Sequence, residues 1–218
     1  MKKAIICFTR VPRPGLTKTR LLPVLTPEQC ARLHWAFLRD LAAVYQQTDA
    51  HLFVAYVADP EWEQLKSVFP HAGFLLQKGN DLGEKMYRAI RTVLDLGYGS
   101  VILTGSDLPM LSAAHLESGF EALEETDIAI GPTSDGGYYL IGMKKPCRDV
   151  FRVEGYGGST VFENTVAAAK NAGLSVGIAA LCDDVDTPQD LAALTKTVRP
   201  GSHTGRCLEQ LKKEGAAL

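Results

Sequence analysis

Carboxylates and cations that follow short apolar segments are the residues of this chain best suited to chemistry. Asp107 comes after the apolar run 101–104 and Gly105, and Leu108-Pro109 then redirects the chain. Open α/β sheets place their ligand crevice beyond the carboxyl ends of the strands. A carboxylate there suits a hard divalent cation, which commonly accompanies a phosphate. The alternative is that Asp107 only caps a turn.

A strongly cationic segment, residues 9–21, follows the first apolar run and carries four arginine or lysine residues, two prolines and a glycine. Gly15 lets the backbone approach a ligand closely, and Lys18 and Arg20 are suited to neutralise phosphate charge. Four cations on one loop repel each other unless an anion lies nearby. Because Walker A spacing is absent, we expect either a different phosphate-binding loop or a solvated basic loop.

Glycines follow an acidic residue in the segment Asp135-Gly136-Gly137-Tyr138. The glycines supply backbone freedom and exposed N–H groups, and the same pattern is also an ordinary hairpin signal. Asp135 could accept hydrogen bonds from acceptor hydroxyls or take part in proton transfer. A weaker signal occurs at residues 79–86, where Asn80 or Asp81 is suited to cap a helix and Gly83 falls in its first turn.

Three carboxylates, Asp183, Asp184 and Asp186, fall within four residues. Like charges this close are costly, and a bound cation would relieve them. Asp186 could therefore share one metal ion with Asp107. The alternative is a helix start, with Asp186 or Thr187 as the cap.

Composition bounds the function. The chain has 218 residues, 46% of them hydrophobic and 22% charged, with a formal net charge of −2, which is typical of a globular α/β protein. No broad basic field is available for nucleic acid, and no apolar run is long enough to span a bilayer. Five scattered cysteines without a C-x-x-C pair favour a reducing, cytoplasmic setting.

Apolar runs alternate with helical patterns, which predicts an α/β fold with a mixed, mostly parallel sheet covered on both faces. We expect one domain over residues 1–198, followed by a loosely attached C-terminal tail over 199–218 with a helical piece at 203–213. The expected strands are 3–8, 51–57, 74–77, 100–103, 127–130, 138–143 and 174–181. The expected helices are a segment from Pro27 onward, 60–69, 80–96, 112–123, 160–173 and 187–198.

Taken together, five segments resemble a bacterial family of glycosyltransferase-A-fold, nucleotide-diphospho-sugar transferase-like proteins of unknown function. Looser similarity extends to nucleotidyltransferases such as phospholactate and molybdenum-cofactor guanylyltransferases. The matching segments are Arg10-x-Pro12-x-x-Gly15-x-x-Lys18-Thr19-Arg20-Leu21, Gly79-x-Asp81-Leu82-Gly83-Glu84-x-Met86, Gly105-Ser106-Asp107-Leu108-Pro109, Gly131-Pro132-x-x-Asp135-Gly136-Gly137-Tyr138-Tyr139-Leu140-Ile141-Gly142 and Asp184-Val185-Asp186-Thr187-Pro188-x-Asp190-Leu191.

The resemblance implies a three-layer α/β/α fold of the nucleotide-diphospho-sugar transferase type, phosphate contacts for Lys18 and Arg20, and a Mg²⁺ or Mn²⁺ ion on Asp107, with Asp186 as a second ligand. The candidate catalytic residues are Asp107, Asp135 and Lys18. The candidate substrate-binding residues are Arg10, Gly15, Lys18, Arg20, Asp81, Gly83, Ser106, Gly136, Gly137 and Tyr138.

The leading hypothesis is a metal-dependent glycosyltransferase that uses a nucleotide-diphospho-sugar donor and a small acceptor. One alternative is a guanylyltransferase-like nucleotidyltransferase, which moves a nucleoside monophosphate from a nucleoside triphosphate and releases pyrophosphate. A second alternative is a non-catalytic nucleotide-binding module, since fold does not fix function. A Rossmann dehydrogenase is disfavoured because no G-x-G-x-x-G follows the first apolar run.

Overall fold

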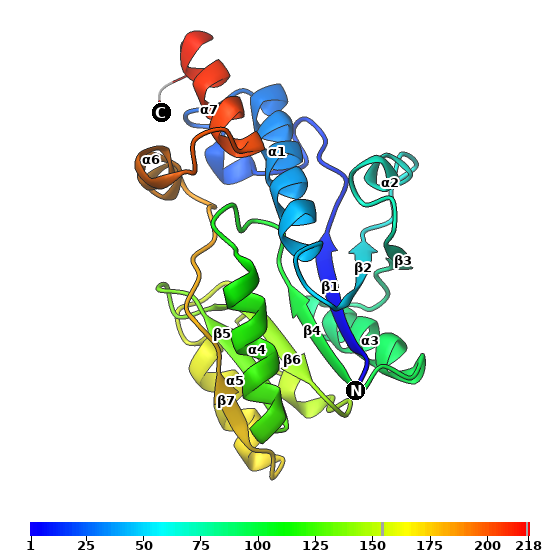
Figure 1. The fold of residues 1–218 in the computed structure, drawn as a ribbon. Coiled ribbons are helices and arrows are strands. Elements are labelled where there is room, and N and C mark those ends of the chain that lie inside the picture. Colours follow the sequence, from blue (N-terminus) through cyan, green and yellow to red (C-terminus); the bar gives the residue numbers. More distant parts are fainter. Residues whose placement is uncertain (154, 217) are drawn as a thin grey trace.

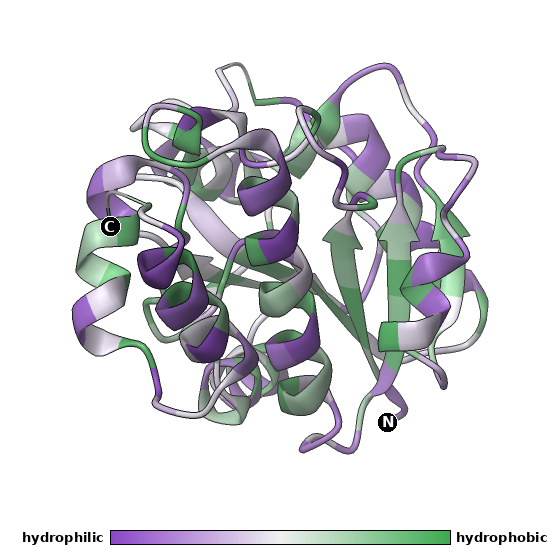
Figure 2. Ribbon diagram, turned by 90° about the horizontal axis from the view of Figure 1, so that it is seen from above, coloured by the Kyte–Doolittle hydropathy of each residue, from purple (hydrophilic) through white to green (hydrophobic). Residues whose placement is uncertain are grey.

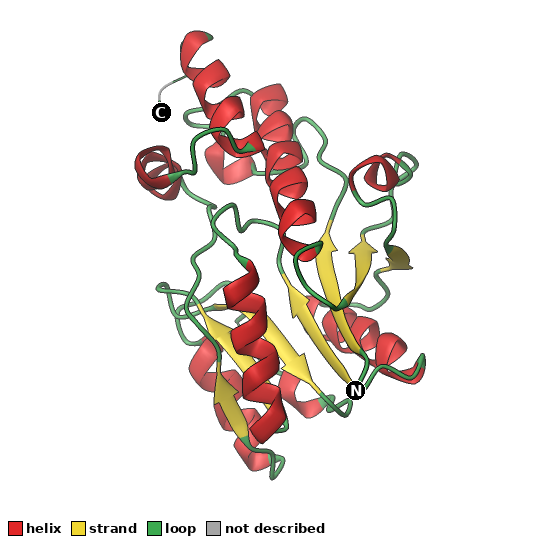
Figure 3. Ribbon diagram, in the orientation of Figure 1, coloured by secondary structure: helices red, strands yellow, loops and turns green. Residues whose placement is uncertain are grey.

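Strands and helices alternate along the chain and build three layers in the computed structural model, which describes residues 1–153, 155–216 and 218 (Figures 1 and 3). The strands are β1 (Lys3–Thr9), β2 (His51–Tyr56), β3 (Gly73–Leu76), β4 (Ser100–Thr104), β5 (Ile128–Pro132), β6 (Tyr138–Met143) and β7 (Val176–Ile178). The helices are α1 (Pro27–Tyr45), α2 (Gln64–Val68), α3 (Leu82–Asp95), α4 (Ala113–Glu125), α5 (Val161–Asn171), α6 (Pro188–Thr197) and α7 (His203–Lys213), with short 3₁₀ turns η1 (Thr19–Leu21) and η2 (Asp149–Phe151).

Within the described residues, seven strands form one sheet in the order β3-β2-β1-β4-β6-β5-β7. β6 runs antiparallel to its neighbours β4 and β5, and the other neighbouring pairs are parallel. The predicted mixed, mostly parallel sheet is therefore confirmed. β5 and β6 pair through the 131–138 turn, because no helix separates them in the sequence.

Helices cover both faces of the sheet. One face packs against α1, α2 and α4, through side chains such as Leu41, Leu65 and Phe120. The other face packs against α3, η2 and α5, through side chains such as Ile90 and Ala169. The strands are mainly hydrophobic and the outer faces of the helices mainly hydrophilic, as Figure 2 shows. This is the three-layer α/β/α arrangement that the family resemblance implied.

The order of the strands fixes where a ligand can bind. From β1 the chain builds outward through β2 and β3, and then crosses to β4 on the other side of β1. The loops that leave β1 and β4 therefore diverge at their carboxyl ends, which is the switch point where open α/β sheets bind ligands. All five residues of β4 are buried, so the strand is a rigid support for the loop that carries Asp107.

Local capping signals placed two helices correctly. Thr26 and Gln29 form the expected capping box at the start of α1, with Pro27 in the first turn. At α6 the cap is Thr187, whose partner in the box is Asp190. Asp186 precedes this cap, and its carboxylate is therefore free for other contacts.

The sequence suggested a loosely attached C-terminal segment, but the structure shows that this segment is packed against the rest of the protein. α7 packs along α1, and Leu208 and Leu211 are buried in a third apolar cluster with α6 and η1. The carboxylate of Asp40 on α1 accepts hydrogen bonds from two backbone N–H groups at the start of α7. The polar residues on the outer face of α7 made its apolar side difficult to recognise in the sequence. This apolar side packs against η1 and so supports the loop that carries Lys18 and Arg20.

Substitution of Leu211 by alanine is expected to lower the free energy of unfolding by about 3 kcal/mol, because it leaves a cavity beside a fully buried side chain. Urea unfolding measures the difference. The exposed neighbour Lys212 provides the control, since Lys212→Ala removes no buried contact. Equal stabilities for the two variants would show that α7 is not part of the core.

The last strand is shorter than expected. The sequence predicted a strand at 174–181, whereas β7 spans Val176–Ile178. Beyond Ile178 the chain leaves the sheet edge, and regular pairing gives way to separate backbone hydrogen bonds from Ala179 to Ile130 and from Cys182 to Pro132. This departure directs the acidic segment 183–186 back toward Asp107, whose carbonyl accepts a hydrogen bond from the N–H of residue 185.

Within the described ranges, no helix combines the length and the apolar composition required to cross a membrane.

Candidate active site at the carboxyl ends of β1 and β4

Lys18 lies at the centre of the switch point. Its side chain is only 2% exposed, and its ammonium contacts Asp107 Oδ1 directly and Asp186 Oδ1 at 3.2 Å. The same ammonium donates to the carbonyl of Val185 at 2.5 Å and lies 5.1 Å from the centre of the Phe37 ring. Lys18, Asp107 and Asp186 are widely separated in the sequence, and the fold brings them together around the charge of the Lys18 ammonium.

This arrangement changes the predicted role of Lys18. The sequence assigned Lys18 to a phosphate, and Asp107 and Asp186 to a shared metal ion. In the structure the cation that the two carboxylates share is the Lys18 ammonium itself. The backbone of Lys18 is in the left-handed region, at φ 51°, which is unusual for a residue with a side chain. We attribute this conformation to the two ion pairs.

The charge of Asp107 is held by its cationic surroundings. Burial raises the pKa of its carboxyl, but the charge and hydrogen bond of Lys18, together with the charge of Arg10, outweigh this effect and leave the pKa below its ordinary value. Asp107 is consequently ionised at neutral pH and remains about one-third exposed.

The carboxylates at this place are of the type that binds a hard divalent cation, but Asp107 Oδ1 and both oxygens of Asp186 already contact Lys18 or Arg20, so a bound ion would share them with these side chains. Asp107 and Asp186 each keep about a third of their side-chain surface exposed, and both offer carboxylate oxygens. Within the described residues, no three histidine, cysteine or acidic side chains are arranged to hold a metal together. The fit is therefore to an ion such as Mg²⁺, which is commonly held by one or two carboxylates with substrate phosphates and water.

His34 is buried beneath this cluster. Its Nδ1 lies 2.5 Å from Thr17 Oγ1, and its Nε2 lies 3.2 Å from Ser106 Oγ. Burial lowers the pKa of His34 to about 4, and the charges of Lys18 and Arg10 add to the effect against the opposing charge of Asp107. The neutral imidazole thus connects the loops that leave β1 and β4.

A pH dependence of stability follows from His34. Between pH 6.5 and 4 the unfolded chain binds a proton that the folded protein excludes, so acidification destabilises the fold. We expect the wild type to lose about 2 kcal/mol more between pH 7 and pH 5 than the non-titrating variant His34→Gln. Urea unfolding at the two pH values measures this, and equal losses would contradict a buried neutral histidine.

A cavity of about 490 Å³, here called the basic cavity, opens above β1 between the 9–20 loop and the start of α3. Its cationic side chains are Arg10, Lys18, Arg20 and Lys85. The other lining residues are Phe8, Thr9, Leu16, Thr17, Thr19, His34, Val57, Gln77, Leu82, Ser106, Asp107 and Asp186. Lys85 was missed because its position in the 79–86 motif showed only a helix start.

The cations of the β1 loop divide into two groups. Arg13 faces away from Asp107 and pairs with Asp59 and Glu61, so it fastens the loop to the segment after β2. Arg20 is 67% exposed and contacts Asp186 at 3.3 Å. Among the described residues, the side chain of Arg10 donates one hydrogen bond, to the backbone carbonyl of Leu16 at 3.3 Å. Arg10 and Arg20 are therefore available to an anion.

A second cavity, of about 320 Å³, lies on the other side of Asp107 and is here called the acidic cavity. Among the described residues, its lining holds Asp107, Asp135 and Asp184 but no lysine, arginine or histidine. The other lining residues are Phe8, Leu82, Met86, Leu103, Gly105, Ser106, Leu108, Thr133, Gly137, Tyr138, Tyr139, Tyr156, Gly157, Gly158 and Val161. The two cavities share Phe8, Leu82, Ser106 and Asp107, and of these Asp107 is the charged residue.

The turn between β5 and β6 presents Asp135 to the acidic cavity. Asp135 Oδ1 accepts hydrogen bonds from Thr133 Oγ1 at 2.5 Å and from the Gly137 N–H at 3.0 Å. Gly136 has φ 88°, and its backbone packs so closely that an added Cβ would lie 1.9 Å from the carbonyl oxygen of Ser159. The glycine is therefore required for the turn to rest on the start of α5.

Asp81 and Gly83 were predicted to bind substrate, but the structure gives both a structural contact. Asp81 caps α3 by accepting a hydrogen bond from the Glu84 N–H at 2.7 Å. At Gly83 an added Cβ would lie 2.2 Å from the carbonyl oxygen of Phe151, so this position sets the distance between α3 and η2. Neither residue lines the basic or the acidic cavity. Their substrate contacts remain a prediction.

Asp184 lines the acidic cavity, although the sequence analysis assigned it no catalytic, binding or metal-binding role. Burial raises the pKa of its carboxyl to about 6, and the negative charges of Asp186, Asp107 and Asp135 add to the shift. Four carboxylates thus lie close enough to affect each other. The crowding of residues 183–186 in the sequence was the available signal.

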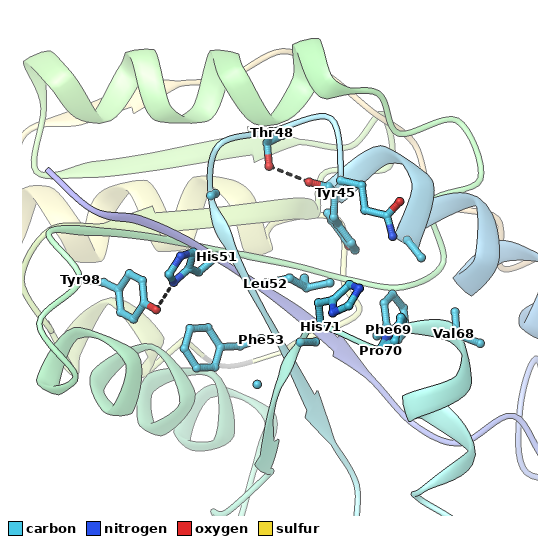
Figure 4. A pocket seen from close by; sticks show the side chains of 15 residues that line it. Tyr45, Thr48, His51, Leu52, Phe53, Val68, Phe69, Pro70, His71 and Tyr98 are labelled. Carbon is cyan, nitrogen blue, oxygen red and sulfur yellow. Dashed lines mark hydrogen bonds between the residues drawn. The ribbon is translucent and has the colours of Figure 1, made fainter.

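A further cavity, of about 560 Å³, lies near the opposite end of the sheet, at the amino end of β2 (Figure 4). Its walls are mainly apolar or aromatic, and His51 contacts the Tyr98 hydroxyl at its edge. None of the residues predicted for the site lines it. The chemistry therefore belongs at the switch point.

Related proteins define the class to which this protein belongs. Its fold matches a crystal structure from Desulfovibrio desulfuricans G20 that is described as a candidate nucleotide-diphospho-sugar transferase. The TM-score is 0.89 and the sequences are 35% identical. The match covers 98% of this chain and 96% of the other. The 2-phospho-L-lactate guanylyltransferase of Halorubrum lacusprofundi is 27% identical, over 92% of this chain and 89% of its own. The phosphoenolpyruvate guanylyltransferase of Sphaerobacter thermophilus is 28% identical, over 87% of this chain and 91% of its own. The protein is a transferase with the nucleotide-diphospho-sugar transferase fold.

The family can be stated more narrowly. The model of the family described as "Uncharacterized protein conserved in bacteria (DUF2064)" matches residues 40–157, from the end of α1 to the acidic cavity. The chain belongs to this family, which confirms the resemblance in the sequence. Asp107 and the Asp135-Gly136-Gly137 turn fall within the matched range, whereas the β1 loop precedes it.

Proposed function

We propose that the protein transfers a nucleoside monophosphate from a nucleoside triphosphate to a small acceptor and releases pyrophosphate. The observation that carries this proposal is the meeting of a basic and an acidic cavity at Asp107, which separates a place for phosphates from a place for a second substrate. The two guanylyltransferase relatives span nearly the whole chain, and they make GTP the first donor to test.

The donor would lie in the basic cavity. Its volume of about 490 Å³ falls within the range of small-molecule sites. Arg10, Arg20 and Lys85 would bind the triphosphate oxygens, with arginine suited to paired contacts and lysine to a point charge. When bound by Asp107 and Asp186, Mg²⁺ or Mn²⁺ would supply further neutralisation of phosphate charge.

The acceptor would lie in the acidic cavity, next to Asp135. In the transfer step the acceptor hydroxyl oxygen forms a bond to the α-phosphorus, the bond from the α-phosphorus to the bridging oxygen breaks, and pyrophosphate leaves with that oxygen. Asp135 takes the hydroxyl proton, because its Oδ1 is fixed by two hydrogen bonds and its Oδ2 has none among the described residues. Arg20, whose side chain is exposed, would offset the charge that develops on the pyrophosphate, while Lys18 stays paired with Asp107 and Asp186.

A pyrophosphate-release assay tests the proposal. The protein is incubated with each of the four nucleoside triphosphates, with Mg²⁺ or Mn²⁺, and with a panel of small alcohols. We expect acceptor-dependent pyrophosphate with one triphosphate, and a loss of this signal in Asp107→Asn. Silence across the panel, in a preparation that binds the triphosphates, would count against nucleotidyl transfer.

Glycosyl transfer from a nucleotide-diphospho-sugar is the second candidate, because the similar solved structure from Desulfovibrio desulfuricans G20 is described in those terms. The products separate the two reactions. Glycosyl transfer releases a nucleoside diphosphate and no pyrophosphate. The same acceptor panel, run with nucleotide-diphospho-sugars, therefore decides between them.

A further inference from the structure

The cavities on the two sides of Asp107 have opposite charge, and the charge of the acidic cavity limits which acceptor can bind there. The basic cavity has four cationic side chains on its walls. Among the described residues, the lining of the acidic cavity has three carboxylates and no cationic side chain. Asp107 is paired with Lys18 from the basic side, so the net negative charge of the cavity comes mainly from Asp135 and Asp184. A neighbouring cavity of about 600 Å³ shares Asp135 and Asp184 and continues the acidic surface to Asp183, Asp186 and Asp190.

We infer that the acidic cavity takes an uncharged or amine-bearing alcohol with an apolar body, and that it disfavours acceptors carrying a phosphate or a carboxylate. This inference rests on the proposed function, because it assigns the acceptor of the proposed transfer. Charge determines which acceptors bind. A carboxylate a few ångströms away weakens the binding of an anion by about tenfold relative to a neutral molecule, and strengthens the binding of a cation to a similar degree.

The shape and polarity of the walls also limit which acceptors bind. Met86, Leu103 and Leu108 provide apolar contact, and Tyr138 and Tyr156 contribute aromatic surface. A volume of about 320 Å³ is at the small end of the range for ligand cavities, so the body of the acceptor is small. Burial of apolar ligand surface would supply most of the affinity.

Tyr138 provides a hydrogen-bonding group within these walls. Its hydroxyl oxygen is buried near the side chains of Tyr156 and Thr165 and makes no well-formed hydrogen bond among the described residues. A buried hydroxyl with poorly placed partners gains from a better one, so a hydroxyl or amine on a bound acceptor would stabilise the complex here. Tyr138 was predicted to bind substrate, and its place in the lining supports that role.

The acidic cavity does not suit the acceptors that the names of the two guanylyltransferase relatives specify. The names of the two guanylyltransferases specify phospholactate and phosphoenolpyruvate, which both carry a phosphate and a carboxylate. The acidic cavity would repel both groups, since Asp135 and Asp184 line it and no cationic side chain among the described residues shares the lining with them. We therefore expect this protein to differ from those relatives in its acceptor.

A matched set of three aromatic alcohols tests the charge preference. 3-Phenyl-1-propanol is neutral, phenylalaninol carries an ammonium, and 3-phenyllactate carries a carboxylate on a similar skeleton. Ligand-observed NMR titrations are run on the full chain in metal-free buffer at low salt. We expect phenylalaninol to bind about tenfold more tightly than the neutral alcohol and at least a hundredfold more tightly than phenyllactate. Equal or tighter binding of phenyllactate would overturn the inference.

Two variants establish where the charge acts. Asp184→Asn removes one carboxylate from the cavity and is expected to reduce the preference for phenylalaninol over phenyllactate about tenfold. Asp95→Asn makes the same change in net charge at the far end of α3, on an exposed residue, and is expected to leave the preference unchanged. An equal effect of both variants would show that net charge, and not this cavity, sets the order.

The two proposals can fail separately. If calorimetry detects no binding of GTP with Mg²⁺ or Mn²⁺ while the alcohols keep the expected order, nucleotidyl transfer is wrong and the charge preference of the cavity stands. If GTP binds and phenyllactate binds as tightly as phenylalaninol, the donor site is supported and the acceptor class is wrong.

Discussion

Replacement of Asp107 by asparagine is expected to lower turnover roughly 10³-fold. Asp107 lines both cavities, contacts the Lys18 ammonium and is kept ionised by its neighbours. Asparagine has nearly the same shape but no charge, so it cannot help to hold a divalent cation or fix the position of Lys18. Steady-state kinetics with the donor and acceptor found in the pyrophosphate assay measure the loss.

The Asp107→Asn protein is expected to remain folded. Lys18 keeps its contacts with Asp186 and with the Val185 carbonyl, so we expect the loss of stability to stay below the roughly 3–5 kcal/mol that an uncompensated buried charge costs. Thermal melting separates a catalytic defect from unfolding. Asp95→Asn, with the same change in charge on an exposed residue, is expected to retain wild-type turnover. An Asp107→Asn protein with more than a tenth of wild-type turnover would contradict the assigned role.

Alanine at Gly136 is expected to destabilise the protein by about 4 kcal/mol. The backbone at φ 88° disfavours any residue with a Cβ, and the new Cβ would lie 1.9 Å from the Ser159 carbonyl oxygen. Relief of this overlap requires a shift of the 131–138 turn away from α5, which would weaken the hydrogen bond from the Phe162 N–H to the Gly136 carbonyl, now 3.0 Å. Because Asp135 lies on the same turn, turnover is expected to fall as well.

Gly173 is the matched control for Gly136. It has a similar φ of 74°, but an added Cβ would meet no atom within 4 Å. Gly173→Ala should therefore show the backbone cost alone, about 1 kcal/mol, with normal turnover. Chemical denaturation of both variants measures the difference, and equal destabilisation would show that the contact with Ser159 does not constrain the turn.

The fold was largely predictable because its signals are local. The capping box at Thr26 and Gln29 and the proline that opens α6 mark helix starts through contacts between near neighbours in the sequence. The lack of a helical pattern between β5 and β6 indicated antiparallel pairing. The attachment of α7 was not predictable in this way, because its partner, α1, is distant in the sequence.

The site was predictable in its location but not in its pairings. Asp107, Asp135 and Arg10 line cavities at the predicted ends of strands. The sequence could not show that Lys18 lies between two carboxylates or that Arg13 pairs with Asp59, because neighbouring cations on one loop look alike. Contacts between distant segments decide which of them face the ligand.

Calorimetric titration of the protein with GTP and Mg²⁺ tests the central claim most directly, which is that the basic cavity holds the triphosphate of a nucleotide. We predict one site per chain, and an affinity about a hundredfold weaker in the double variant Arg10→Ala, Lys85→Ala, because both cations line the cavity away from the Lys18 ion pairs. Unchanged affinity in that variant, or no binding of GTP, ATP, CTP or UTP by the wild type, would contradict the assignment.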